Sequence, residues 1–129
     1  MQALCKNLIA GEWVAGASVT HNRNPSDVRD VIGEYAQADA TQTAMAIAAA
    51  KQAFPAWATA SIQDRSNILD KAGTEILARK DELGRLLSRE EGKTLPEGIG
   101  EAARAGMIFK FFAGEALRLE KPNPDTLQP

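Results

Sequence analysis

The sequence contains little of the chemistry on which small enzymes and metal proteins depend. It has one cysteine, Cys5, and one histidine, His21, among 129 residues. A single cysteine excludes an internal disulfide and favours a reducing compartment. A metal cluster or a nucleophile–histidine triad needs more histidine or cysteine side chains than the chain holds. We therefore expect no catalytic residue in this chain.

The two rare residues themselves carry no signal of reactivity. A reactive thiol needs a positioned cation or a helix end beside it, and Cys5 has only Lys6 as a charged neighbour. We interpret Cys5 as an inert thiol. His21 lies in an expected strand without a partner in the sequence pattern, so we interpret it as structural.

Charge and hydropathy exclude two further classes of partner. The formal net charge is −2, and both signs are spread along the chain. Nucleic-acid binding and membrane-surface binding both need clustered Lys and Arg, so we expect neither partner. No apolar run approaches the length of about 20 residues that a membrane span needs. The first residues lack the pattern of a signal peptide, and we expect a cytoplasmic protein.

The first third of the chain has strand patterns. Residues 7–14 predict a hairpin that turns at Gly11. Residues 20–24 and 31–36 predict two more strands, separated by turn residues that begin at Pro25. Strands are therefore expected within residues 7–37, without an internal repeat.

From Asp39 onward the pattern becomes helical and predicts helices within residues 40–119. Asp39 with Gln42, and Ser61 with Asp64, have the spacing of helix N-caps. The first helix has an apolar face at helical spacing and should end or kink at Pro55. A second has its own apolar stripe, and a third begins at residue 81 and stops at residue 92. The two stripes comprise Ala44, Ile47, Ala48 and Phe54, and then Ile68, Leu69, Ala72 and Ile76.

The fourth helix has the clearest start signal. Thr94 and Glu97 have the spacing of a capping box, with Pro96 in the first turn. Each interior glycine costs a helix about 1 kcal/mol relative to alanine, so a helix with four needs close packing. We expect its buried face to comprise Phe109, Phe112, Ala116 and Leu117, and we expect residues 121–129 to be a disordered tail.

Five segments resemble the aldehyde dehydrogenase family in the order and spacing of that family. They are Ile9–Val14 (I-A-G-E-W-V), Asn24-Pro25 with Val31–Gly33 (V-I-G), Ala53–Trp57 (A-F-P-A-W), Glu91–Leu95 (E-G-K-T-L) and Phe111–Ala116 (F-F-A-G-E-A). No single segment is decisive, but five in order make coincidence a poor explanation. The stretches 24–37 and 90–117 are most similar to bacterial enzymes that oxidise α-ketoglutarate semialdehyde, with succinate-semialdehyde dehydrogenases as close neighbours.

This resemblance implies a fold class and a function. It implies an α/β fragment in which short strands and a hairpin precede about four helices, without a complete Rossmann unit. Residues 1–120 would form the N-terminal segment of the cofactor-binding domain. The intact family member oxidises an aldehyde with NAD or NADP through a cysteine thiolate, and the resemblance places that cysteine, the general base and the cofactor loop beyond Pro129.

The chain alone is therefore expected to be inactive and to bind no cofactor. Two alternatives stay open. The chain could be a fragment of a succinate-semialdehyde dehydrogenase, or an interaction module derived from a truncated enzyme, which associates with itself or with a homologue. The second alternative rests on the apolar helical face that is left without its sheet.

The candidate site residues come from the same resemblance. Arg104 lies on the glycine-rich helix that lines the aldehyde entry tunnel in the family, where an arginine could hold a substrate carboxylate through paired hydrogen bonds. A solvated face, or a salt bridge to Glu101 or Glu97, is the alternative. The carbonyls of Asn22 and Arg23, together with Glu90, lie where some relatives hold a structural monovalent cation. Gly98–Ala103 fits G-x-G-x-x-A, but no strand precedes it, so we do not interpret it as a nucleotide loop.

Overall fold

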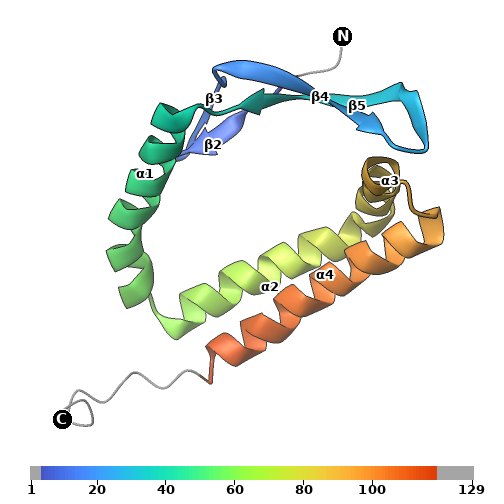
Figure 1. The fold of residues 1–129 in the computed structure, drawn as a ribbon. Helices are drawn as coiled ribbons and strands as arrows, with labels where there is room; N and C mark the ends of the chain where they lie inside the picture. Colours follow the sequence, from blue (N-terminus) through green and yellow to red (C-terminus); the bar gives the residue numbers. More distant parts are fainter. Residues whose placement is uncertain (1–3, 119–129) are drawn as a thin grey trace, which may run out of the picture.

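The computed structural model describes residues 4–118 and has strands at one end and long helices at the other (Figure 1). Residues 119–129 lie outside the described part of the chain, so the expected tail at residues 121–129 is not described here. The elements in chain order are β1 (Leu4–Cys5), β2 (Asn7–Ile9), β3 (Glu12–Val14), β4 (Ser18–Asn24), β5 (Asp27–Gln37), α1 (Ala40–Thr59), α2 (Ile62–Ala78), α3 (Lys80–Glu91) and α4 (Leu95–Ala116). The expected order of strands followed by four helices is confirmed.

The hairpin β2–β3 forms where the sequence predicts it. The two strands are antiparallel, and Ala10 and Gly11 connect them with φ angles of 54° and 85°. A two-residue connection with both residues in the left-handed region matches the twist of a hairpin, and glycine adopts that region without steric cost.

The second sheet has the strand order β1-β5-β4. β4 and β5 are antiparallel, and their pairing shifts register around Arg23. β1 pairs parallel to β5 through Leu4 and Cys5. The sequence pattern predicted shorter strands at β4 and β5 and no strand at β1, because β1 exists only through a partner that lies about thirty residues away.

The helix caps are confirmed. Of the two outcomes expected at Pro55, an end or a kink of the helix, the end does not occur. Asp39 accepts a hydrogen bond from the Gln42 backbone amide at 2.8 Å, and Ser61 accepts one from Asp64 at 3.0 Å. α1 continues through Pro55 to Thr59. Proline removes one helical hydrogen bond, and the carbonyl of Lys51 that loses it lies in an exposed stretch where water can satisfy it.

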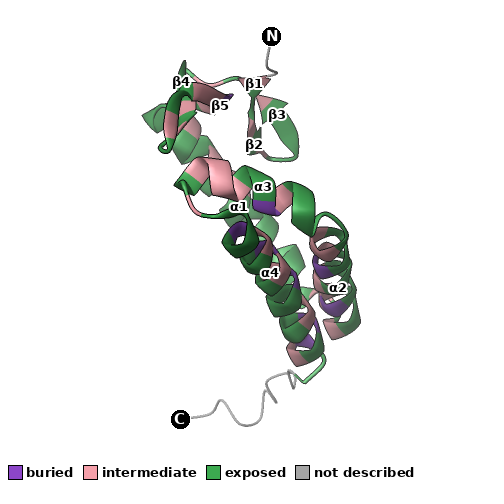
Figure 2. Cartoon of the chain, turned by 90° about the vertical axis from the view of Figure 1, so that its right-hand side faces the viewer, coloured by how far each residue is buried: buried purple, intermediate pink, exposed green. Residues whose placement is uncertain are grey.

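The expected buried face of α4 is wrong for its aromatic residues. Phe109 and Phe112 are 37% and 54% exposed. α4 packs against α2 and α3 along a side with buried residues, drawn purple in Figure 2. The buried residues on this side are small. Its buried members are Gly98, Ala102, Gly106, Ala113 and Ala116.

Small residues occupy this side because the helices approach closely. A Cβ atom added at Gly98 would lie 2.4 Å from the Gly84 carbonyl oxygen of α3, and one at Gly73 of α2 would lie 2.9 Å from the Gly106 carbonyl oxygen. Phenylalanine cannot fit between backbones at such distances. The large side chains of α4 therefore lie on its other sides.

Candidate functional site

A group of polar contacts fastens the β4–β5 sheet to α3. Arg89 of α3 donates two hydrogen bonds to the Asp30 carboxylate of β5, at 2.6 and 2.9 Å. Asn24 donates a third at 3.3 Å. These donors, Arg89 first and Asn24 second, lower the pKa of Asp30 below its ordinary value. The same pairing raises the pKa of Arg89. No local sequence pattern marks this ion pair, because its two members are 59 residues apart.

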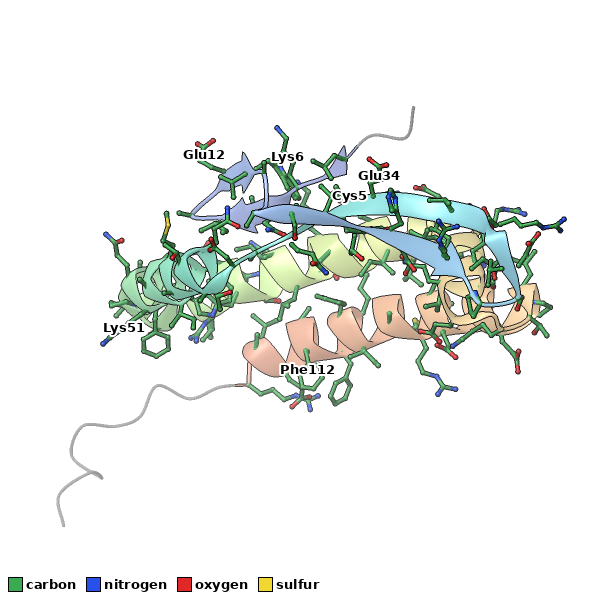
Figure 3. All side chains as sticks on the ribbon, turned by 45° about the horizontal axis from the view of Figure 1, so that its top comes forward. Cys5, Lys6, Glu12, Glu34, Lys51 and Phe112 are labelled. Atoms are coloured by element: carbon green, nitrogen blue, oxygen red, sulfur yellow. The ribbon has the colours of Figure 1, made fainter. Side chains whose placement is uncertain are left out.

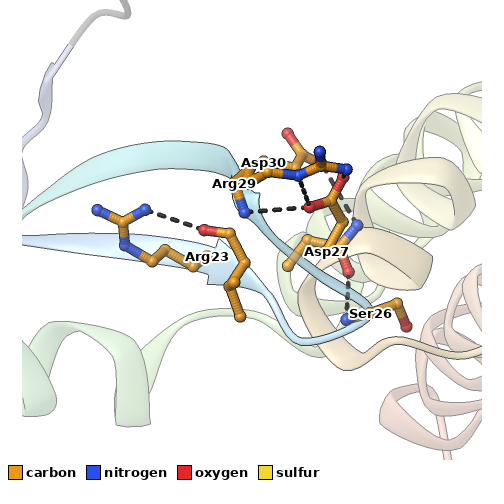
Figure 4. Close-up of polar contacts among 7 residues, drawn as sticks. Arg23, Ser26, Asp27, Arg29 and Asp30 are labelled. Carbon is orange, nitrogen blue, oxygen red and sulfur yellow. Dashed lines mark hydrogen bonds and ion pairs between the residues drawn. The ribbon is translucent and has the colours of Figure 1, made fainter.

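The turn at Pro25 and Ser26, which leads into the strand that carries Asp30, is held by local contacts (Figure 4). The Ser26 backbone amide donates to the Asn24 side chain at 2.9 Å. Asp27 accepts hydrogen bonds from the backbone and side chain of Arg29, which lower the pKa of Asp27. The turn therefore presents Asp30 to α3 in a defined orientation.

Two of the three expected cation-site residues lie together. Asn22 donates to Glu90 Oε1 at 2.9 Å, and the Tyr35 hydroxyl donates to the same oxygen at 3.2 Å. Burial, followed by the neighbouring Glu90, raises the pKa of Tyr35. The Arg23 side chain instead donates to the Val28 carbonyl at 3.0 Å. The expected site used the carbonyls of Asn22 and Arg23, which lie at the register shift of β4, and the cation assignment stays a prediction.

Arg104 is exposed on α4 and has no hydrogen bond or ion pair among residues 4–118. The two glutamates that could have neutralised it are engaged elsewhere. Glu101 accepts a hydrogen bond from Lys93 at 2.6 Å, and Glu97 closes the capping box with Thr94. The expected salt bridge of Arg104 to either glutamate is therefore absent from the described chain.

An exposed apolar strip extends from Arg104 toward the C-terminal end of α4. Met107, Ile108 and Phe111 follow it at helical spacing, on the same side of α4, and are 63%, 49% and 61% exposed. We call these four residues the Arg104 face. A cation within an apolar surface suits a ligand with an apolar chain and an anionic end.

The structure places the other residues that the sequence analysis considered. Cys5 is an exposed free thiol at the end of β1. His21 Nδ1 lies 3.5 Å from Glu34 Oε1 on the neighbouring strand. The described residues contain no group of three His, Cys, Asp or Glu side chains placed to hold a metal ion. The G-x-G-x-x-A pattern lies inside α4, which follows α3 and not a strand.

The Asp30–Arg89 pair predicts a pH effect on stability. A carboxylate whose pKa is lower in the folded state stabilises the fold above its unfolded pKa, about 3.9, and this contribution is lost as the pH falls through the folded pKa. Asp30→Asn should therefore be less stable than the wild type at neutral pH, and the gap should narrow as the pH falls below about 4. Urea midpoints measured from pH 7 down to pH 2 test this, and a gap that is constant over that range contradicts it.

The comparison with known proteins decides the family. The model of the aldehyde dehydrogenase family matches residues 13–127. The chain belongs to the aldehyde dehydrogenase family. It matches the N-terminal region of longer members and spans about a quarter of their length.

Three relatives show how similar this chain is in sequence to longer dehydrogenases. An α-ketoglutarate semialdehyde dehydrogenase of Haloferax volcanii is 38% identical over 88% of this chain and 24% of its own length. The α-ketoglutaric semialdehyde dehydrogenase of Bacillus subtilis is 37% identical over 87% of this chain and 23% of its own length. The mitochondrial succinate-semialdehyde dehydrogenase of Arabidopsis thaliana is 32% identical over 88% and 22%.

Solved dehydrogenase structures share its backbone. An NAD-dependent aldehyde dehydrogenase of Sinorhizobium meliloti superposes with a TM-score of 0.86 at 31% identity, over 93% of this chain and 25% of that one. A betaine aldehyde dehydrogenase of Staphylococcus aureus, in complex with NAD+, superposes with a TM-score of 0.84 at 27% identity, over 94% and 26%. No helix within the described part of this chain is both long and apolar enough to cross a membrane.

Proposed function

We propose that this chain is the N-terminal segment of an NAD(P)-dependent dehydrogenase that oxidises a semialdehyde to the corresponding acid. Its relatives are named for α-ketoglutarate, malonate, succinate and glutarate semialdehydes. Each of these compounds carries an aldehyde at one end and a carboxylate at the other. α-Ketoglutarate semialdehyde is our first choice of substrate, and succinate semialdehyde is the alternative.

The observation that carries this proposal is the Arg104 face. A carboxylate that enters an apolar passage needs a fixed cation, because an unpaired buried charge is strongly disfavoured. Arg104 is exposed and unpaired within residues 4–118, and exposed apolar side chains follow it on the same side of α4. Its guanidinium can bind a carboxylate through two parallel hydrogen bonds, while Met107 and Ile108 contact the carbon chain. The role of this segment is then to position the acidic end of the substrate.

We assign NAD(P), the hydride acceptor, no contact with residues 4–118. NAD and NADP bind where a strand leads through a glycine-rich turn into a helix, and residues 4–118 contain no such unit. NAD(P) would accept the hydride from the substrate when it is bound elsewhere in the fold. The chain's own residues would contribute scaffold and substrate positioning.

The experiment is a segment exchange. Residues 13–118 replace the matching stretch of the Bacillus subtilis relative, and NADH formation is followed with α-ketoglutarate semialdehyde. We expect a rate no more than about tenfold below the parent, equivalent to a barrier change of about 1.4 kcal/mol. We expect no NADH from the 129-residue chain alone. An inactive but folded hybrid, or turnover by the isolated chain, contradicts the proposal; the parent with the stretch deleted gives the background rate.

A further inference from the structure

Helix α1 packs against little else in the described part of the chain. It has 20 residues, and none of them is buried. It packs chiefly against the short strand β2, and Figure 1 shows it apart from the α2–α4 pair. Most helical stability in proteins comes from packing an apolar face against other elements. α1 therefore has a side that is suited to packing against something else.

That side is apolar. Ile47 and Phe54 are each 65% exposed, and Trp57 is 45% exposed. Their positions along the helix place them on neighbouring sides of α1. We call these three residues the α1 face. Large aromatic and branched side chains grouped on one surface mark an interaction site.

The rest of the chain is also open. Within residues 4–118 the buried apolar residues are Ile32 and three alanines, and no large side chain is fully buried. Phe112 projects from α4 on the side away from the sheet (Figure 3). The surface that a closed fold would bury is therefore left accessible.

We propose that residues 1–129, even without a peptide bond to the rest of the fold, dock through the α1 face onto the remaining part of an aldehyde dehydrogenase fold. The inference rests on the proposed family role, and adds that the docking needs no covalent link. The chain spans 25% of a solved relative and follows its backbone with a TM-score of 0.86, so the surface complementary to α1 belongs to the other three quarters. A second copy of this chain offers only the same uncovered helices and lacks that complementary surface.

The experiment is co-expression with a tagged partner. The partner is the Bacillus subtilis relative from which the stretch matching this chain has been deleted, and the relative's own excised stretch serves as the positive control. We expect the 129-residue chain to co-purify with the tagged partner at one copy per partner chain, by native mass spectrometry. We also expect the partner's soluble yield to rise when the chain is present.

Matched variants test the surface. Ile47→Glu/Phe54→Glu should reduce co-purification at least tenfold, because the new carboxylates would have to be buried. Gln52→Glu/Ala56→Glu adds the same charge to exposed positions on another side of α1 and should bind as the wild type does. Circular dichroism of each variant controls for helix content.

Other outcomes overturn the inference. A partner that stays insoluble or free of the chain overturns it, as does equal capture of both double variants. A mass that shows the chain paired only with itself also overturns it. An active covalent hybrid together with failed docking would reject this inference and leave the proposed function intact.

Discussion

Replacing Arg104 by leucine in the hybrid enzyme is expected to lower kcat/KM for α-ketoglutarate semialdehyde by about 30-fold or more. In the hybrid, the proposed substrate passage encloses Arg104, which is exposed in residues 4–118 alone. Removing one partner of a buried, hydrogen-bonded charge pair costs about 2–5 kcal/mol, because the other charge stays desolvated and unpaired. The substrate carboxylate is that other charge. Arg104 is available for this role because Glu101 and Glu97 are engaged by Lys93 and Thr94.

A neutral control substrate distinguishes a loss of carboxylate binding from a general loss of enzyme activity. A neutral aldehyde of the same length should lose little, and Arg104→Lys should keep part of the activity, because lysine retains the charge without the paired geometry. Arg85→Leu removes another exposed arginine that has no ion pair among the described residues, and it should leave both substrates unaffected. Equal losses with the acidic and the neutral substrate would reject the role of Arg104.

Gly98→Ala is expected to destabilise the 129-residue chain by about 3 kcal/mol, at the upper end of the usual range for overpacked cores. The added methyl group would lie 2.4 Å from both the Gly84 carbonyl oxygen and Ser88 Oγ. One of these atoms is backbone and cannot turn away. The Ser88 hydroxyl bonds to the carbonyls of Gly84 and Thr94, so moving it would disturb the start of α4 as well.

Gly100→Ala is the matched control on the same helix. A Cβ at Gly100 meets nothing within 4 Å. Alanine should therefore stabilise the chain by about 1 kcal/mol, which is the intrinsic helix preference of alanine over glycine. Urea unfolding followed by far-UV circular dichroism measures both variants. Effects of the same sign would show that α3 and α4 do not approach as closely as the structure describes.

The two glycine variants show which features of α4 the sequence predicts and which it does not. Four glycines in α4 predict close packing somewhere, and that prediction is right. Their spacing does not say which glycines are in contact. Gly98 and Gly106 face α3 and α2, whereas Gly100 and Gly114 face open space, because the orientation of a helix is set by its neighbours.

The candidate site divides in the same way. Arg104 and the pair of Asn22 with Glu90 could be named in advance, because the resemblance to a family placed them. The Asp30–Arg89 ion pair could not, because charged residues are common and nothing local marks two of them as partners.

The sequence by itself determined the family, the order of strands and helices, the turn at Gly11 and the helix starts at Asp39, Ser61 and Thr94. These depend on backbone preferences and caps that act within a few residues. Only the tertiary structure decided which side of each helix is buried, that β1 joins β5, that α1 continues past Pro55, and that the large side chains of α1 and α4 stay exposed. Those outcomes depend on contacts between distant segments. In α1 the large side chains stay exposed because no other described segment of this chain covers them.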